Sequence, residues 1–181
     1  MQDSQVLIAP RFIAPSEQDV LREWAERMQP YLRPNRRGPM RAFRQVQDLP
    51  HIPDAYTETR RRVQGALGVN DEDCDPEVGW ILSRIGNGGF VHPHRDPVPD
   101  GFRHLRCNLF IQTPLGGGVP VIDSVPQPFE ERMLLCFFAS ERRHWSTPVE
   151  GDRARIMCSF GYLVSQDFCL PAHLSVRAQP D

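Results

Sequence analysis

The segment LSRIGNGGFVHPHRD (residues 82–96) joins two short strand-like segments through a glycine turn and ends in a His-Arg-Asp triplet. Side chains at positions i and i+2 of an extended strand share one face. His94 and Asp96 therefore project together and offer one imidazole nitrogen and one carboxylate oxygen. The neighbouring backbone cannot close a coordination face around these two atoms, so a third ligand has to come from a distant segment.

Histidines further along the sequence are the candidates for this third ligand. The best placed is His144, which follows the apolar segment MLLCFFAS (133–140) and precedes the turn STPVEGD (146–152). Two histidines and one carboxylate leave three coordination positions of a metal ion open. This arrangement is typical of non-haem Fe(II) oxygenases, so His94, Asp96 and His144 are the predicted metal ligands and catalytic residues.

The segment RARIMCSFGYL (153–163) offers an anchor for an organic acid. On a strand, Arg153, Arg155 and Ser159 share one face, and a guanidinium with a hydroxyl further along suits the capture of a carboxylate. All 21 basic residues of the chain are arginine, so any cationic anchor has to be a guanidinium. The residue pattern alone leaves both arginines open.

From Val78 onward the sequence is typical of short strands separated by Gly, Pro, Asn and Asp turns. Six such segments without a helical pattern between them predict an antiparallel sandwich or barrel. The six segments are VGWILSRI, GGFVHPH, HLRCNLFIQ, VPVID, RMLLCFFA and RARIMCSFGYLV.

The first half of the chain carries helical patterns instead. Ser16 is a candidate N-cap of one helix, and a second is expected from about Pro53 to Leu67, where Gly68 ends it. Between them, RPNRRGPM (33–40) is expected to form a loop because of its Pro and Gly content. We expect the helices to pack against one outer sheet of the β core.

Length, charge and cysteine content limit the number of domains, the kinds of partner and the cellular compartment. A chain of 181 residues is expected to form one domain, with helical support over about 1–75, the β core over about 76–165 and a tail over 166–181. The net charge of −2 gives no reason to expect a nucleic acid or an anionic membrane as partner, and no apolar run is long enough for a membrane span. Five scattered cysteines without a CxxC pair indicate a reducing compartment, and we expect the cytoplasm.

The order His94-Arg95-Asp96, then His144, then an arginine in a following strand resembles the Fe(II)/2-oxoglutarate-dependent dioxygenases, and among them the prolyl-hydroxylase-like group. The flanks resemble the same family over roughly residues 78–165. LSRIGNGGFVHPHRD resembles the strand-turn-strand before its HxD motif, LRCNLFIQTPLGGG (105–118) the strand and glycine turn after it, and HWSTPVEGDRARIMCSFGYLV (144–164) its closing segment.

The resemblance implies a double-stranded β-helix, or jelly roll, in which His94, Asp96 and His144 bind Fe(II). It implies that 2-oxoglutarate chelates the iron and places its far carboxylate on Arg155 or Arg153. Arg155 is preferred because it leads directly into RIMCSFG, which resembles the family's Arg-led final strand. Dioxygen would convert 2-oxoglutarate to succinate and carbon dioxide while a substrate C–H is oxidised.

The chain departs from this group at Ile85, where many members carry a tyrosine that helps to hold the cosubstrate. Asn108, Ser159 or Tyr162 could fill that vacancy. Strand alternation in RCNLFIQ also puts Arg106 and Asn108 on one face, so both are candidates for contact with 2-oxoglutarate or substrate.

Three functions remain open at this point. The first is hydroxylation of an unactivated carbon, for which we expect a small metabolite, such as an amino acid or natural-product intermediate, rather than a protein side chain such as proline. The second is a cupin-like metalloenzyme without an organic-acid cosubstrate, against which the arginine after His144 argues. The third is a non-catalytic jelly-roll module for binding or sensing, against which the complete triad argues.

Overall fold

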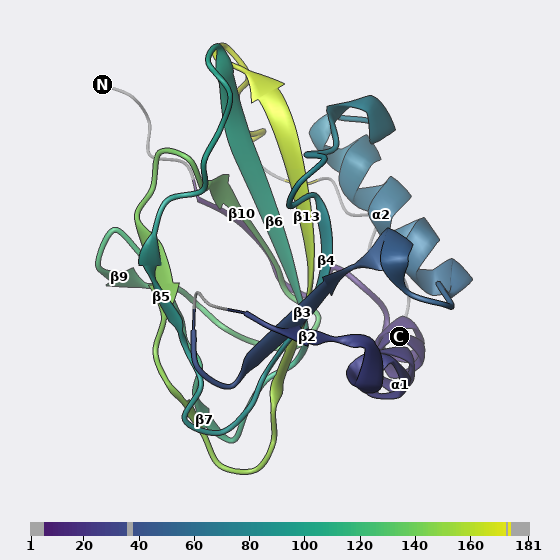
Figure 1. Ribbon diagram of the computed structural model, residues 1–181. Coiled ribbons are helices and arrows are strands. Elements are labelled where there is room, and N and C mark those ends of the chain that lie inside the picture. Colours follow the sequence, from purple (N-terminus) through teal and green to yellow (C-terminus); the bar gives the residue numbers. More distant parts are fainter. Residues whose placement is uncertain (1–5, 36–37, 173, 175–181) are drawn as a thin grey trace.

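The protein folds as a mainly β jelly roll with two helices on one outer face (Figure 1). The computed structural model describes residues 6–35, 38–172 and 174. Its larger sheet has seven antiparallel strands. In spatial order they are β1 (Leu7–Ala9), β10 (Leu134–Phe138), β6 (Phe102–Gln112), β13 (Arg155–Ser165), β4 (Trp80–Ile85), β3 (Arg41–Gln45) and β2 (Arg33–Pro34).

A smaller sheet lies on the side of the larger sheet that faces away from the helices (Figure 1). It contains β5 (Val91–His94), β11 (His144–Ser146), β8 (Pro120–Ile122) and β9 (Val125–Pro126), in this spatial order. A separate two-stranded ribbon pairs β12 (Val149–Glu150) with β7 (Gly116–Gly117).

The helices α1 (Pro15–Met28) and α2 (Asp54–Leu67) cover the outer face of the larger sheet. Their buried residues, among them Trp24 and Tyr56, form one core with the outward side chains of β6 and β13. Each fully buried large apolar side chain of this kind contributes about 1.5–3 kcal/mol. Short 3₁₀ helices span Gln29–Tyr31, Val46–Asp48 and Asp71–Asp73.

Strand alternation separates this core from the interior of the jelly roll. Cys107 and Leu109 of β6 belong to the core under the helices, whereas Asn108 between them lines a cavity on the inner face. In β13, Phe160 faces the helices and Ser159 the cavity. The two long strands therefore carry a dry outer face and a polar inner one.

The structure confirms the jelly-roll class, the supporting helices and all six strands expected after Val78. It differs in the first half, where β1, β2 and β3 join the larger sheet, so that the expected loop at 33–40 contains β2. The predicted N-cap at Ser16 is wrong: the cap is Ala14, because Pro15 opens the first turn and Glu17 accepts the Ala14 N–H at 2.8 Å.

Helix α2 begins and ends as expected, with Gly68 in the left-handed conformation at φ 71°. Within the described ranges, neither helix combines the length and apolar character that a membrane crossing needs.

Candidate functional site

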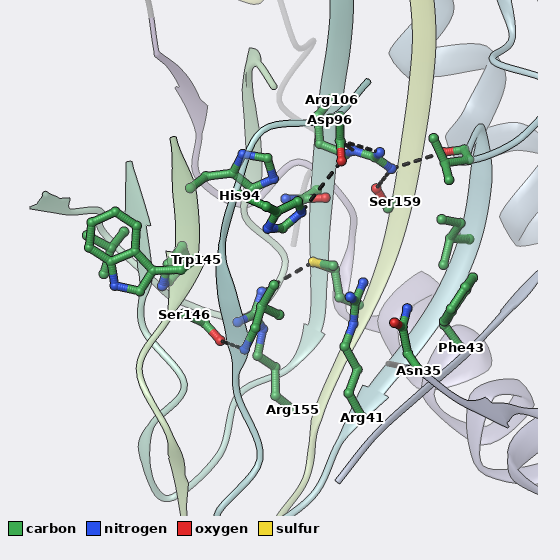
Figure 2. A pocket seen from close by; sticks show the side chains of 18 of the residues that line it. Asn35, Arg41, Phe43, His94, Asp96, Arg106, Trp145, Ser146, Arg155 and Ser159 are labelled. Carbon is green, nitrogen blue, oxygen red and sulfur yellow. Dashed lines mark hydrogen bonds and ion pairs between the residues drawn. The ribbon is translucent and has the colours of Figure 1, made fainter. Parts of the chain in front are cut away.

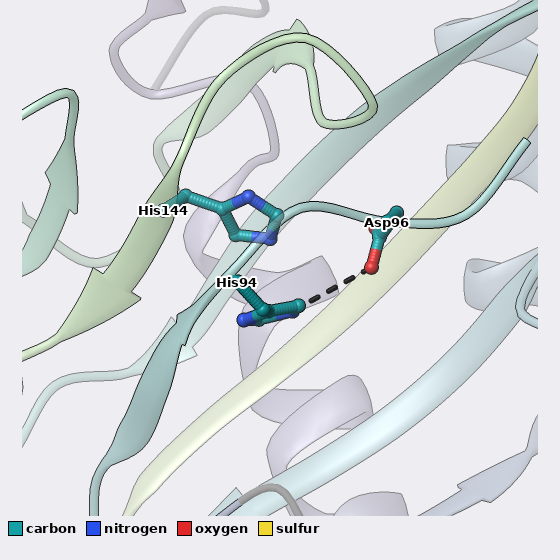
Figure 3. A group of neighbouring side chains, drawn as sticks. All are labelled: His94, Asp96 and His144. Atoms are coloured by element: carbon teal, nitrogen blue, oxygen red, sulfur yellow. Dashed lines mark ion pairs between the residues drawn. The ribbon is translucent and has the colours of Figure 1, made fainter.

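Three side chains with metal-binding atoms converge on the smaller sheet (Figure 3). His94 ends β5 and His144 begins β11, and the two residues pair directly across the strands. Opposed residues of antiparallel strands share a face, and the two imidazole centroids lie 4.2 Å apart. Asp96 follows in extended chain, fixed by its N–H donating to the Ala139 carbonyl at 2.9 Å. One ligand atom from each residue of this triad lies within 4.8 Å of the other two.

Backbone carbonyls orient both imidazoles of the triad. Nδ1 of His94 lies 2.7 Å from the His92 carbonyl oxygen, and Nδ1 of His144 lies 3.0 Å from that of Arg142. A carbonyl oxygen can only accept, so each Nδ1 carries the proton and each Nε2 keeps its lone pair for a metal. His94 Nε2 is 3.5 Å from Asp96 Oδ1. That is close to the roughly 3 Å between neighbouring ligands that each lie about 2.1 Å from one ion.

Arg106 holds the carboxylate of the triad. Its Nε and Nη2 donate to Asp96 Oδ2 at 3.2 and 2.6 Å, while Nη1 donates to the Val78 carbonyl and to Ser159 Oγ, both at 3.0 Å. Burial alone would raise the pKa of Asp96, which is 4% exposed, but the charge of Arg106 holds that pKa well below its usual range. Asp96 is therefore ionised, with Oδ2 held by Arg106 and Oδ1 turned toward His94.

The second imidazole is held in its neutral form. Burial, and next the neighbouring His94, lower the pKa of His144 to about 4. A neutral imidazole is the form that binds a metal. Two imidazoles and one carboxylate on one side of a prospective ion fit a divalent transition metal with open positions.

A further buried histidine lies behind the triad and outside the cavity lining. His104 is fully buried, and its Nδ1 lies 3.2 Å from Oδ2 of Asp75. The other carboxylate oxygen of Asp75 accepts the N–H groups of Glu77 and Val78. Burial first, and then the charge of Arg106, lower the pKa of His104 to about 4.

We expect the free energy of unfolding of the metal-free protein to fall as the pH drops from about 6.5 to 4. In this window folded His104 and His144 stay neutral, whereas the unfolded chain protonates both, so acid favours unfolding. The combined loss is on the order of a few kcal/mol, measurable by urea unfolding at several pH values. His104→Asn should flatten this dependence by about half, and a wild-type stability that is constant across the window would contradict the assignment.

The triad opens into a cavity of about 410 Å³ between the two sheets (Figure 2). This volume is in the range of small-molecule sites. Figure 2 shows His94, Asp96 and Arg106 at one end of the cavity and Arg41 and Arg155 at the other. The remaining walls are mainly apolar, with contributions from Phe43, Val78, Ile81, Val91, Pro120, Val121, Ile122, Phe137, Trp145 and Met157.

Arg155 is a buried cation in this cavity. It is 4% exposed, its Nη1 donates to the Gly118 carbonyl at 2.9 Å, and its Nη2 lies 3.5 Å from Met157 Sδ. Its buried Nε has no hydrogen-bond partner, and no acid among the described residues is ion-paired with it. Burial, and next the charge of Arg41, lower the pKa of Arg155 to about 9. A buried guanidinium without a carboxylate is stabilised when an anion binds beside it.

Arg153, the other candidate anchor, lies outside the cavity. Its Nη2 donates to Glu131 Oε1 at 2.6 Å, and its side chain is 39% exposed. The cavity thus contains one of the two arginines that the sequence left open.

Of the remaining predicted residues, three line the cavity and one does not. Asn108 and Ser159 line the cavity, and Oδ1 of Asn108 is buried without a hydrogen-bond partner. Arg106 also lines it, but its guanidinium is used by Asp96 and Ser159. Tyr162 faces the helices and belongs to the core beneath them, so the suggestion that its phenol fills the vacancy at Ile85 is wrong.

Sequence reasoning missed the part of the cavity that comes from the first half of the chain. Arg41 and Phe43 of β3 line it, together with Asn35. The alternation of Arg41, Phe43 and Gln45 is a strand signal, but its charged and polar members conceal it next to the Pro- and Gly-rich stretch that precedes it.

Comparison with solved structures gives the same fold. The viral collagen prolyl hydroxylase vCPH from Paramecium bursaria Chlorella virus-1, in complex with 2-oxoglutarate, matches with a TM-score of 0.67 and 14% identity, over 90% of this chain and 97% of that one. A Pseudomonas putida prolyl-4-hydroxylase matches with a TM-score of 0.63 and 17% identity, over 89% of this chain and 92% of that one.

A third similar structure carries a small molecule. HygX from Streptomyces hygroscopicus, with nickel, 2-oxoglutarate and hygromycin B bound, matches with a TM-score of 0.61 and 11% identity, over 90% of this chain and 84% of that one. No protein-family model and no curated protein sequence matches the chain. The chain therefore shares its fold with these three proteins.

Proposed function

We propose that the protein is an Fe(II)- and 2-oxoglutarate-dependent oxygenase that hydroxylates an unactivated C–H bond of a small metabolite. The observation that carries this proposal is the presence, in one cavity, of the triad and of the buried Arg155. The triad suits a divalent metal, and Arg155 suits a carboxylate. The similarity in fold to vCPH and HygX, both crystallised with 2-oxoglutarate, supports the same assignment.

In this proposal His94, Asp96 and His144 bind the iron from one side and leave its other positions to ligands. The carbonyls of His92 and Arg142 keep both Nε2 atoms aimed inward, and Arg106 keeps Asp96 ionised. Iron and 2-oxoglutarate, when bound, supply the oxidation of the substrate by dioxygen, with succinate and carbon dioxide as co-products.

Arg155 is proposed to bind the carboxylate of 2-oxoglutarate that does not reach the metal. Its guanidinium already lies in the cavity, backed by the rings of Phe110 and Phe129 at 5.4 and 5.6 Å. Asn108 and Ser159 line the same cavity and are proposed to contact cosubstrate or substrate through their side chains. Arg153 is not proposed as a ligand, because Glu131 holds it outside.

The apolar walls are proposed to bind the substrate and to exclude water during oxidation. Phe137 packs edge-on against the His144 ring at 5.0 Å between centroids, which limits solvent access to that ligand. Trp145, next to the same histidine, lines the cavity from the smaller sheet (Figure 2).

We expect Arg106→Met to weaken metal binding by about 10- to 100-fold, the usual cost of losing a partner that orients a ligand. Without Arg106, burial raises the pKa of Asp96, and Oδ2 loses the two hydrogen bonds that the guanidinium donates. Calorimetric titration of the apoprotein with Ni²⁺ would measure the loss. Arg103→Met is the matched control, because it removes a guanidinium of the same strand that is paired with Glu141 outside the cavity; equal losses in both variants would contradict the positioning role.

Two substrate classes fit the cavity and the similar structures. A mainly apolar cavity of about 410 Å³ supports a small molecule, and HygX with hygromycin B is one small-molecule example of the fold. The similar prolyl hydroxylases make a peptide proline the second candidate. Succinate release measured across free amino acids, other metabolites and proline-containing peptides distinguishes the two, and stimulation by peptides alone would reject the metabolite.

The non-catalytic alternative predicts a different result in the same assay. A binding or sensing module would retain 2-oxoglutarate without forming succinate above the rate without protein. An oxygenase forms some succinate even without substrate, and this formation depends on added Fe(II).

The cytoplasm is proposed as the compartment. The five cysteines are all free, and three of them are buried. Free cysteines are usual in a reducing environment.

A further inference from the structure

Two arginines of the larger sheet face the same part of the cavity. Arg41 of β3 and Arg155 of β13 are both in register with Ile85 of β4, which lies between them. Residues in register across neighbouring strands point to one face, and strands lie about 4.8 Å apart, so the two arginine Cα atoms are about 10 Å apart. Long side chains can close that distance, and Figure 2 shows both at the end of the cavity away from Asp96.

The two guanidinium groups are close enough to affect each other. The charge of Arg41 contributes, after burial, to the lowered pKa of Arg155. Two like charges in one poorly solvated space repel unless an anion lies between them. Among the described residues that line the cavity, Asp96 is the only acid, and it belongs to the triad with Arg106 on its Oδ2. An anion bound between the two guanidinium groups would offset this repulsion.

One arginine does not satisfy a carboxylate here. A carboxylate offers about four acceptor sites on two oxygens, whereas Arg155 already spends one Nη1 hydrogen on Gly118 and turns Nη2 toward Met157. Ile85, between the two arginines, has no group to donate. A second donor from the neighbouring strand would complete the binding site.

We propose that Arg41 is a second anchor for the distal carboxylate of 2-oxoglutarate and forms, with Arg155, a two-guanidinium clamp around it. The clamp rests on the proposed function, because it assigns the cosubstrate of the same site. It gives Arg41 a role in binding the cosubstrate and none in orienting the metal.

Comparing the binding of two 2-oxo acids distinguishes a role of Arg41 in binding the distal carboxylate from a role in orienting the metal. 2-Oxoglutarate and 2-oxopentanoate have the same length and the same metal-chelating end, but the second carries a methyl group where the first has its distal carboxylate. Calorimetric binding of each acid to the Ni²⁺-loaded protein isolates the contribution of that carboxylate. Arg41→Gln should raise the Kd of 2-oxoglutarate by about 10- to 100-fold, the value of one or two charge-assisted hydrogen bonds. The Kd of 2-oxopentanoate should stay within about twofold.

Two further variants complete the experiment. Arg41→Lys keeps the charge and the aliphatic stem, so it should fold like the wild type and give an intermediate Kd for 2-oxoglutarate. Arg44→Gln is the matched control, because Arg44 lies on the same strand, outside this cavity and beside Asp48. It should change neither Kd.

The outcomes are distinguishable. The clamp is overturned if Arg41→Gln leaves the Kd of 2-oxoglutarate unchanged, or if it weakens the binding of both acids equally. In either case, binding of 2-oxoglutarate by the wild-type protein still supports the proposed function. A wild-type protein that binds Ni²⁺ but neither acid rejects the proposed function itself.

Discussion

His144→Ala is expected to abolish high-affinity metal binding and, with it, succinate formation. In the proposed metal site His144 supplies one of three ligand atoms, the one that comes from β11, so its loss opens the site on that side. The affinity for the metal should fall by more than about 100-fold, because loss of a residue that only orients a metal ligand already lowers it by about 10- to 100-fold. Calorimetric titration of the apoprotein with Ni²⁺ measures the affinity, and succinate release with Fe(II) measures the activity.

His92→Ala is the matched control for this variant. The His92 side chain is exposed and lies outside the cavity lining, and the alanine variant keeps the carbonyl that orients His94. It should bind metal as the wild type does. If instead His144→Ala bound Ni²⁺ normally, the residue would be a packing partner of Phe137 and the assignment of the metal site would be wrong.

Arg155→Met is expected to raise the Kd of 2-oxoglutarate by about 100-fold or more, because it removes the buried charge that we propose pairs with the distal carboxylate. The same change should leave the stability of the ligand-free protein unchanged or raise it. In that state Arg155 is a buried cation without a carboxylate, and methionine fits among the neighbouring Phe110, Phe129 and Met157. Binding to the Ni²⁺-loaded protein and thermal unfolding of the apoprotein give the two readouts.

A purely structural arginine would show the opposite pattern, with lost stability and an unaltered Kd. Arg153→Met serves as the control from the same segment: it breaks the surface ion pair with Glu131 and should cost at most about 1 kcal/mol. A larger effect on 2-oxoglutarate binding from Arg153 than from Arg155 would reverse the assignment of the anchor.

The sequence predicted those parts of the site whose geometry is local. His94 and Asp96 are two residues apart on an extended segment, so the period of a strand is enough to place them together. Arg155 and Ser159 share a face of β13 for the same reason, and both line the cavity. The dry and polar faces of β6 and β13 follow from the alternation of their residues.

The sequence could not predict contacts that depend on pairing between strands. The sequence predicts His144 as the third ligand from its place after an apolar segment and from the family resemblance, but not from strand alternation, because β11 (His144–Ser146) has only three residues. The register with β5 is what brings His144 opposite His94. Arg41 and Arg155 likewise lie near each other only because β4 pairs with both of their strands. Pairing across a sheet is a tertiary choice that the local pattern of a short strand does not encode.

The same limit applies to the partner of Arg106. Strand alternation predicts that it faces the cavity, and it does. Its partner is nevertheless the carboxylate of Asp96, because the chain after β5 turns toward β6 and brings Oδ2 within 2.6 Å of Nη2. The guanidinium that the sequence offers to 2-oxoglutarate or substrate is thus already hydrogen-bonded to the carboxylate of the triad.

Anaerobic titration with Fe(II) and 2-oxoglutarate shows whether the triad holds iron together with the cosubstrate, because the visible charge-transfer absorption of that complex requires a chelating 2-oxo acid on iron held by the protein. We predict that the wild-type protein develops this band at one iron per chain and that His144→Ala does not. A folded wild-type protein that shows no band at saturating Fe(II) and 2-oxoglutarate would contradict the account.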